Sequence, residues 1–170
     1  SFMPTYRRSQ LAAQKVKVVL TGDGGDELFA GYDRYKAFFS DPDLFVKSPL
    51  EFQRSYFKNV GLLDEVEKND LYSSNMKSSL SGLDSFDVIA PYLNQSRHMD
   101  RINQVLYADT MLLLPGNNLV KPDRMGMAAS IEARTPFLDY RMVELAFQMP
   151  GSLKLKNGET YNYGFGWEIS

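Results

Sequence analysis

The sequence predicts an α/β domain in which helix predominates. Two observations carry this prediction: a short apolar run at residues 16–20 that leads directly into a glycine-rich acidic turn, and helical spacing of apolar residues over much of the chain after residue 50. A strand, a tight turn and a helix in this order form the pattern in which ligands bind beyond the carboxyl ends of strands. With 170 residues, the chain has the size of one ordinary domain.

The first elements follow from local composition. Residues 4–15 open with Pro and contain good helix formers, so they are expected to form a helix. Residues 16–20, VKVVL, are rich in β-branched side chains and predict a buried strand. A helix is then expected to open at Asp26 or Glu27, because the apolar residues that follow have helical spacing.

The remainder of the chain favours helices over 50–61, 62–70 and 97–114. Residues 70–85 are rich in Ser and Asn and are predicted to be a mobile surface connection. One strand cannot make a sheet, so either the pattern hides short strands or partner strands lie in an N-terminal part that this chain lacks; the second explanation is favoured. The apolar surface near residues 16–20 would then be covered by that missing N-terminal half or by a second copy of the chain.

Charge and cysteine content exclude several classes of protein. Nineteen Lys and Arg oppose 21 Asp and Glu, so the net charge of -2 gives no attraction to nucleic acid or to an anionic membrane. No apolar stretch reaches the roughly 18 residues that a membrane span needs. The absence of Cys excludes disulfides and Cys-ligated zinc, and it fits a cytoplasmic location.

The first candidate site is the segment 21–32, TGDGGDELFAGY. Its glycines allow the backbone to approach a ligand and to point N–H groups at phosphate oxygens, and its acids supply the hard oxygens that Mg²⁺ requires. The alternative is an acidic helix start, in which the acids only cap the first turn. The residues concerned are Gly22, Gly24, Gly25, Asp23, Asp26 and Glu27.

The second candidate site is the segment 113–140, in which charged residues alternate with small and apolar ones. This mixture favours buried ion pairs. Lys121, Asp123 and Arg124 could hold a phosphate or a carboxylate substrate, or they could belong to a structural ion-pair network. For Arg134 and Asp139 the structural interpretation is preferred.

These two segments resemble signature blocks of a known family. TGDGGDELFAGYDRY resembles the second nucleotide motif of glutamine-dependent asparagine synthetases and the related β-lactam synthetases, and LVKPDRMGMAASIEARTPFLDYRMVELA resembles the block that follows it. The resemblance extends to about Thr160. It implies that the chain is the C-terminal portion of one synthetase domain with a partial adenine nucleotide α-hydrolase-like fold, the fold of PP-loop ATP pyrophosphatases, without its N-terminal strands.

The resemblance also implies a reaction. ATP would transfer AMP to the side-chain carboxylate of aspartate, and ammonia derived from glutamine would displace AMP from the β-aspartyl-AMP intermediate. The departing pyrophosphate gathers negative charge, so Mg²⁺ and a Lys are the stabilisers that such a site needs. The implied roles are ATP contacts for Thr21, Gly22, Gly24, Gly25 and Arg124, catalysis by Asp23 and Lys121, and metal binding by Asp26.

The sequence departs from the family pattern in three places. Asn118 stands about where relatives often have an acidic residue, and no counterpart of a late family Lys follows the KNGET turn. The first nucleotide loop, SGGxDS, would have to lie upstream; residues 81–85, SGLDS, imitate it but are expected to form an ordinary turn. These departures leave a second hypothesis open for the isolated chain, a truncated non-catalytic helical module that keeps part of the nucleotide site.

Several single residues invite a functional assignment but favour a structural one. His98 has no second His or Cys near it and is expected at the surface. Tyr32, Tyr35, Phe38 and Phe39 could stack on adenine, but aromatic residues at helical spacing are more often core. Trp167 receives no role. The acceptor carboxylate and the nitrogen donor stay open, because the family glutaminase domain uses an N-terminal Cys and this chain has none.

Overall fold

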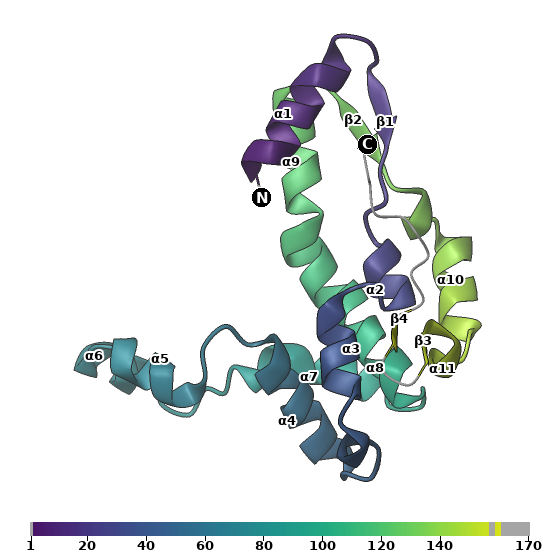
Figure 1. The fold of residues 1–170 in the computed structure, drawn as a ribbon. Coiled ribbons are helices and arrows are strands. Elements are labelled where there is room, and N and C mark those ends of the chain that lie inside the picture. Colours follow the sequence, from purple (N-terminus) through teal and green to yellow (C-terminus); the bar gives the residue numbers. More distant parts are fainter. Residues whose placement is uncertain (1, 157–158, 161–170) are drawn as a thin grey trace.

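A computed structural model describes residues 2–156 and 159–160 of the chain. Helices make up most of this part, as the sequence predicted (Figure 1). The α-helices are α1 (Phe2–Ala13), α2 (Gly25–Phe29), α3 (Asp33–Phe39), α4 (Pro49–Val60), α5 (Glu65–Leu71), α6 (Ser74–Ser79), α7 (Phe86–Gln95), α8 (Arg101–Ala108), α9 (Val120–Ala128), α10 (Tyr140–Gln148) and α11 (Gly151–Lys154). The 3₁₀ helices are η1 (Pro42–Phe45) and η3 (Pro136–Leu138), and η2 (Asp109–Asn118) is a π-helix. The strands are β1 (Val18–Leu20), β2 (Glu132–Arg134), β3 (Leu155–Lys156) and β4 (Glu159–Thr160).

The strands β1 and β2 form a parallel pair in which Val19 lies opposite Ala133. The helices between them supply the long connection that parallel strands need. This pairing corrects the expectation that every partner of the first strand lies outside the chain. The segment EAR was not predicted as a strand, because two of its three residues are charged and it lacks the β-branched residues that favour strands.

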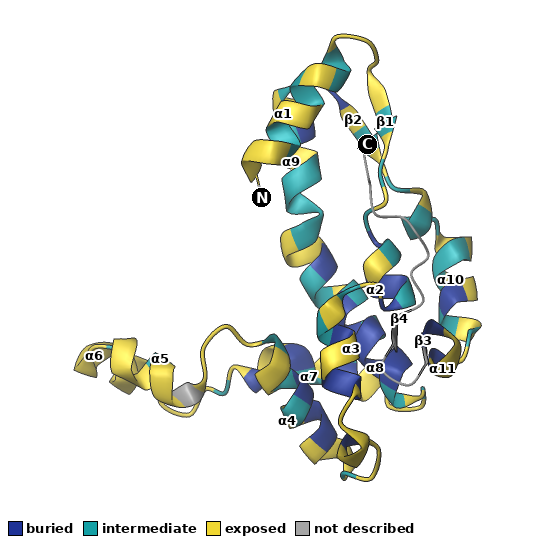
Figure 2. Ribbon diagram, viewed as in Figure 1, coloured by how far each residue is buried: buried dark blue, intermediate teal, exposed yellow. Residues whose placement is uncertain are grey.

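The strand β1 is not buried, which is a second correction. The side chain of Val18 is 39% exposed and that of Leu20 is 65% exposed, as the colouring of β1 in Figure 2 shows. A continuous apolar run predicts a strand that is covered on both faces. The helices α1 and α9 pack against each other on one side of the strand pair (Figure 1), so the described residues cover it only partly.

The hydrophobic core lies at the other end of the molecule, among α3, α4, α7 and α8 (Figures 1 and 2). Tyr35, Phe38 and Phe39 belong to it, which confirms their predicted structural role. The ring centroid of Phe38 lies 5.3 Å from that of Tyr56 and 5.9 Å from that of Phe52. Edge-to-face and tilted pairs at such distances are favourable beyond the area that they bury.

The helices of this core begin at clear sequence signals. Ser48 and Glu51 form a reciprocal capping box before α4, in which each side chain bonds the backbone N–H of the other residue. Asp100 caps α8 by accepting a hydrogen bond from the backbone of Asn103. The helix that was predicted over 97–114 begins at Arg101 as α8. It continues into the π-helix η2, which contains Pro115.

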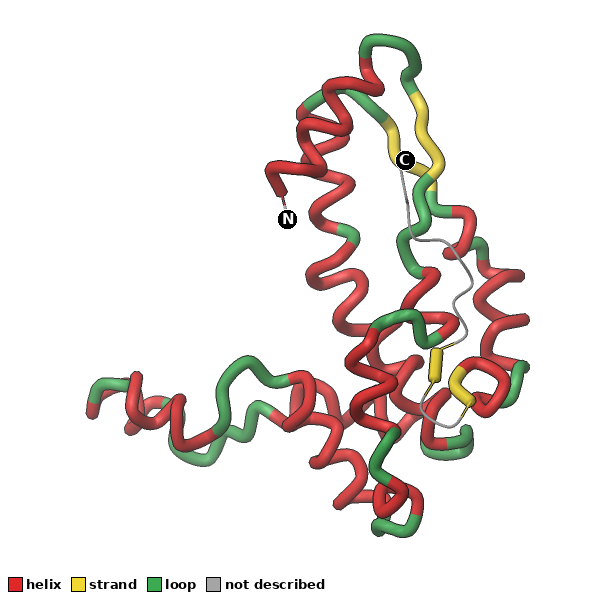
Figure 3. Tube along the Cα trace, viewed as in Figure 1, coloured by secondary structure: helices red, strands yellow, loops and turns green. Residues whose placement is uncertain are grey.

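Residues 70–85 contain a helix, α6, where a connection without regular structure was expected. Ser73 caps α6 by accepting from the backbone N–H of Met76, so serine acts here as a helix-start signal. The helices α5 and α6 form an arm that projects from the core, as the tube in Figure 3 shows. The prediction that this segment lies at the surface is confirmed. Among all the described residues, no helix is long and apolar enough to cross a membrane.

Candidate functional site

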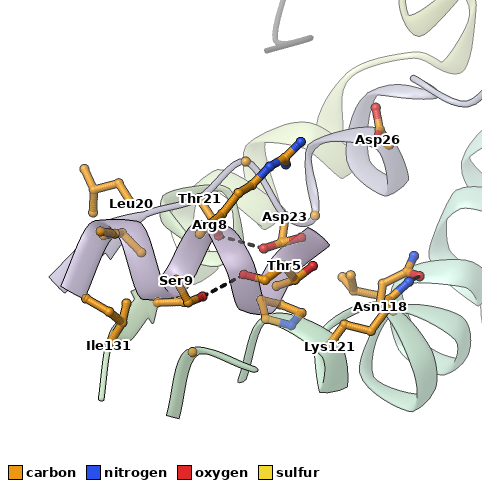
Figure 4. A pocket seen from close by; sticks show the side chains of 18 of the residues that line it. Thr5, Arg8, Ser9, Leu20, Thr21, Asp23, Asp26, Asn118, Lys121 and Ile131 are labelled. Atoms are coloured by element: carbon orange, nitrogen blue, oxygen red, sulfur yellow. Dashed lines mark hydrogen bonds between the residues drawn. The ribbon is translucent and has the colours of Figure 1, made fainter. Parts of the chain in front are cut away.

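A cavity of about 610 Å³ lies beside the end of β1. Its walls are the glycine-rich turn with the start of α2, the face of α1 that carries Thr5 and Arg8, the end of η2 and the first turns of α9 (Figure 4). The predicted residues Thr21, Gly22, Asp23, Gly24, Asp26 and Lys121 all line it. The two segments that the sequence singled out, about ninety residues apart, therefore meet at one cavity.

The glycine-rich turn is held by backbone hydrogen bonds and by one positive φ angle. The N–H of Thr21 donates to the carbonyl of Arg134 at 2.8 Å, which extends the pairing of β1 with β2 into the turn. Gly24 has φ +91°, and a Cβ there would lie 2.3 Å from Cδ2 of Leu138. Both the left-handed conformation and the close approach explain why glycine stands at this position.

Two acids of the turn point in different directions. Asp23 accepts a hydrogen bond from the hydroxyl of Thr21 at 2.7 Å, and its carboxylate faces the cavity (Figure 4). Asp26 lies further along the turn, in the first turn of α2. Asp26 and Glu27 both stand in the first turn of α2, as the alternative interpretation of an acidic helix start expects, but the N-cap residue is Gly24 and no side-chain capping bond is present there.

The surroundings of Asp26 disfavour its negative charge. Burial raises the pKa of Asp26, and the negative charges of Glu27 and Asp23 raise it further, while Arg34 lowers it. Burial is the largest of these effects, because it removes the carboxylate from water. No group of three or more His, Cys, Asp or Glu side chains with metal-binding geometry occurs among the described residues. Mg²⁺ sites in general need only one or two carboxylates, because the ion keeps waters and substrate oxygens as its other ligands.

A polar cluster that the sequence did not predict as a unit joins the start of α2 to the end of η2 and the first turn of α9. Glu27 is 1% exposed and accepts from the hydroxyl of Tyr32 at 2.9 Å and from Nδ2 of Asn118 at 2.8 Å. The carbonyl oxygen of Asn118 accepts from Nζ of Lys121 at 3.3 Å. Burial and the charge of Glu27 raise the pKa of Tyr32, so its hydroxyl keeps its proton and donates it to this bond.

Two predicted site residues lie outside the cavity wall. Arg124 is exposed on α9, where Pro122 and Gly126 line the cavity instead. Gly25 packs near the ring of Phe137, and a Cβ there would contact that ring at 3.6 Å. The roles assigned to these two residues stay predictions, because Gly25 adjoins Gly24 and Asp26 in the turn without lining the cavity and the side chain of Arg124 does not line it either.

The expected buried ion pairs are exposed, which corrects a further prediction. Arg134 pairs with Glu132 at 2.8 Å and Arg141 pairs with Asp139 at 2.9 Å, each within its own short segment. Both pairs lie at the surface because β2 and the start of α10 are uncovered there. Exposed pairs of this kind contribute little to stability, and they do not join one element to another.

The remaining sequence candidates are confirmed as structural features. The SGLDS segment forms an exposed turn in which Gly82 has φ +82°, and Asp84 bonds Arg54 and the backbone of Phe86. His98 is exposed in the turn after α7. Trp167 lies outside the described residues.

The sequence alone did not reveal the contribution of α1. Thr5, Arg8, Ser9 and Ala12 line the cavity, with Thr5 and Arg8 shown in Figure 4. No local motif marks them, because their place depends on the packing of α1 against α9, more than a hundred residues later. Glu27 carried a weak signal, since it follows Asp26 in the same acidic turn.

Comparison with known proteins identifies the family. The asparagine synthase family model matches residues 1–162. A glutamine-hydrolyzing asparagine synthetase of Bacillus subtilis is 34% identical over 93% of this chain and 29% of its own length. A putative asparagine synthetase of Mycobacterium tuberculosis is 31% identical over 94% of the chain and 28% of its own length. An amidase of Gibberella zeae, chry2, is 24% identical over 85% of the chain and 27% of its own length.

The chain thus spans less than a third of the length of these relatives. No solved structure matches it, so the PP-loop pyrophosphatase fold stays a prediction, while the observed helices with a small parallel sheet agree with an α/β class. The two motifs occur in the expected order, and the family model covers nearly the whole chain. On these grounds, the chain belongs to the asparagine synthase family.

Proposed function

We propose that this chain forms part of an enzyme that uses ATP and Mg²⁺ to activate a carboxylate and convert it into an amide. In the complete protein the carboxylate would be the side chain of aspartate, activated as β-aspartyl-AMP, and the nitrogen would come from glutamine or ammonia. One observation carries the proposal: the acidic glycine turn and Lys121 face each other across one cavity, in a chain of the asparagine synthase family.

The residues that line the cavity fit magnesium and phosphate oxygens. Asp23 and Asp26 offer carboxylate oxygens, and the backbone at Gly22 and Gly24 is open to a ligand. Magnesium, when bound, would neutralise the charge that gathers on the departing pyrophosphate. Lys121 would hold the same anion from the opposite wall, as a point charge that needs no fixed angle of approach.

Asp23 and Thr21 would act on the other side of this anion. The hydroxyl of Thr21 donates to Asp23, which fixes the direction of that carboxylate in the cavity. We propose that Asp23 positions the groups that react during acyl transfer. It is held by this bond at the carboxyl end of a strand, where ligands of α/β proteins bind.

The unpaired edge of β1 is a place where a further strand could bind. One edge of β1 pairs with β2, and the described residues provide no strand for its other edge. We propose that strands from the N-terminal half of the complete protein, or from a second copy of the chain, pair there and cover Val18 and Leu20. A cytoplasmic location also remains part of this proposal.

A titration of Mg-ATP into the chain tests the function. The first nucleotide loop of the family is absent from the sequence, so several phosphate contacts would be missing. At about 0.5 to 3 kcal/mol per hydrogen bond, their loss weakens ATP binding by orders of magnitude. We therefore expect weak calorimetric binding and no release of AMP from ATP and aspartate by this chain alone. Micromolar binding would show that the first loop is dispensable.

The second arm uses the complete protein. Asp26→Asn removes one carboxylate of the proposed metal site and should abolish amide formation. Asp123→Asn is the matched control, because Asp123 is an exposed carboxylate that does not line the cavity. Full activity of the Asp26→Asn enzyme would remove the metal assignment. A complete protein that forms no amide even without the substitution would favour the alternative hypothesis, a helical module without catalytic function.

A further inference from the structure

Glu27 is a buried carboxylate in the wall of the candidate site. It is 1% exposed although it lines the cavity, and no Lys or Arg among the described residues forms an ion pair with it. A buried charge is costly unless donors surround it. The donors found here are the neutral hydroxyl of Tyr32 and the neutral amide of Asn118, and both reach the same oxygen, Oε1.

This arrangement fixes the orientation of the Asn118 amide. An ionised carboxylate only accepts hydrogen bonds, so the NH₂ group of Asn118 has to face Glu27. The opposite orientation would place two acceptors 2.8 Å apart. The Nδ2 atom also lies 3.2 Å from the hydroxyl of Tyr32, which holds the amide on the same side. The carbonyl oxygen of Asn118 is therefore directed away from Glu27.

That carbonyl oxygen holds the ammonium group of Lys121. Nζ of Lys121 donates a hydrogen bond to Oδ1 of Asn118 at 3.3 Å. Within the described part of the chain, this is the side-chain hydrogen bond that Lys121 makes. Lysine has four rotatable bonds, so ordering such a side chain on ligand binding costs conformational entropy. A lysine that is already directed into the cavity avoids part of this cost.

We infer that Glu27 is a positioning residue, which sets the Asn118 amide so that Lys121 is held ready to bind an anion in the cavity. Figure 4 shows Asn118 and Lys121 together on one wall, across from Asp23. The inference rests on the proposed function in one respect, namely that the anion is a phosphate group that binds with magnesium. The hydrogen-bonded chain from Glu27 to Lys121 exists without that ligand, so it can be tested separately.

The test combines NMR of the full 170-residue chain with calorimetry. NMR reports the exchange of the Asn118 side-chain amide with water and the order of the Lys121 ammonium group. Glu27→Met removes every acceptor from position 27 and should accelerate the amide exchange and loosen Lys121. Tyr32→Phe is the matched control, since it removes the hydroxyl that donates to Glu27 and accepts from Asn118 but leaves the shorter bond from Asn118 to Glu27. It should leave Lys121 ordered.

A swap of the two functional groups separates positioning from simple packing. In the double variant Glu27→Gln with Asn118→Asp, the NH₂ group lies at position 27 and the carboxylate at position 118. This pair restores the hydrogen bond in the opposite sense and still presents an oxygen to Lys121. The order of Lys121 should return to that of the wild type. Asn118→Ala provides a second route to the loosened state if Glu27→Met does not fold, because Glu27 then keeps Tyr32.

Calorimetry with magnesium pyrophosphate measures the consequence for binding. Glu27→Met and Asn118→Ala should weaken the affinity by up to about tenfold, which corresponds to the ordering of one long side chain. Unchanged order of Lys121 in Glu27→Met and Asn118→Ala would overturn the inference. If Lys121 loosens in both variants but neither the chain nor the complete protein binds magnesium pyrophosphate, the positioning stands and the proposed function fails.

Discussion

Two regions of the molecule differ sharply in how much they bury. The helical core, defined as α3, α4, α7 and α8, contains large side chains that are fully enclosed, such as Phe52, Tyr56, Leu93 and Leu106. The sheet layer, defined as α1, β1, α9 and β2, is thinly covered. The described part of α1 has no buried residue, and both strands follow an exposed, intermediate, exposed pattern.

The cavity lies between these regions, and the difference explains its construction. The sheet layer provides an open wall, where the backbone at Gly22 and Gly24 and the side chains of α1 are within reach of a ligand. The other wall is formed by α2 and η2, which pack against α8 of the helical core and where Glu27 is enclosed and hydrogen-bonded. A catalytic group gains accuracy when rigid elements hold it, and access to a ligand requires the open wall.

The largest predicted effect is a loss of stability when a large side chain of the helical core is replaced by a small one. Leu106→Ala removes a side chain that is 0% exposed in the helical core and should cost about 2–5 kcal/mol of unfolding free energy. Leu11→Ala is the control in the sheet layer, where Leu11 is 67% exposed, and it should change the stability by less than about 0.5 kcal/mol. Urea unfolding measures both. Equal losses would mean that the sheet layer is packed as firmly as the core.

The second prediction concerns the turn that joins the two regions. Gly24→Ala places a Cβ in a left-handed conformation and within 2.3 Å of Leu138, so it should cost about 2 kcal/mol. Gly22→Ala is the control, because no heavy atom lies within 4 Å of its added Cβ. It should cost less than about 0.5 kcal/mol. Thermal unfolding of both variants measures the difference, and a tolerated alanine at position 24 would contradict the observed turn.

Local signals allowed the sequence to predict one half of the site. A β-branched run, three glycines and two acids lie within eleven residues, so the strand, the turn and the start of α2 follow from neighbours along the chain. The serine-rich segment was misjudged because Ser serves both turns and helix caps, and Ser73 uses the second option. A helix was predicted over 62–70, and the structure has α5 from Glu65 to Leu71, which begins after the local capping box of Asp64 and Glu67.

The other half of the site depends on long-range packing and left no local trace. Asn118 meets Glu27 across 91 positions of sequence. The strand β2 exists because Glu132 to Arg134 align with β1, although the segment itself is charged and short. The exposure of β1 could not be predicted either. An apolar run indicates that a strand is stable when buried, but it does not show which elements cover the strand.

The smallest predicted effect is a pH dependence of the stability that arises at Lys154 of α11, next to α8 of the helical core. Lys154 is fully buried, and its ammonium group donates to Oδ1 of Asn103 at 2.8 Å. Burial lowers the pKa of Lys154 to about 8 from the ordinary 10.5, and the nearby Asp100 opposes this shift. The unfolded chain therefore binds more protons than the folded chain between these two pH values, and the stability rises with pH across that interval.

This charge thus destabilises the fold at neutral pH, and the penalty is relieved as the pH increases. From about pH 8 to about pH 9.5, the unfolding free energy should gain about 1–2 kcal/mol from Lys154. Lys154→Met has a side chain of similar length without a charge, so it should remove this gain and serve as the matched control. Other groups titrate in both proteins, and the difference between the two curves isolates Lys154. Parallel curves would show that water reaches Lys154 and that this part of the molecule is as open as the sheet layer.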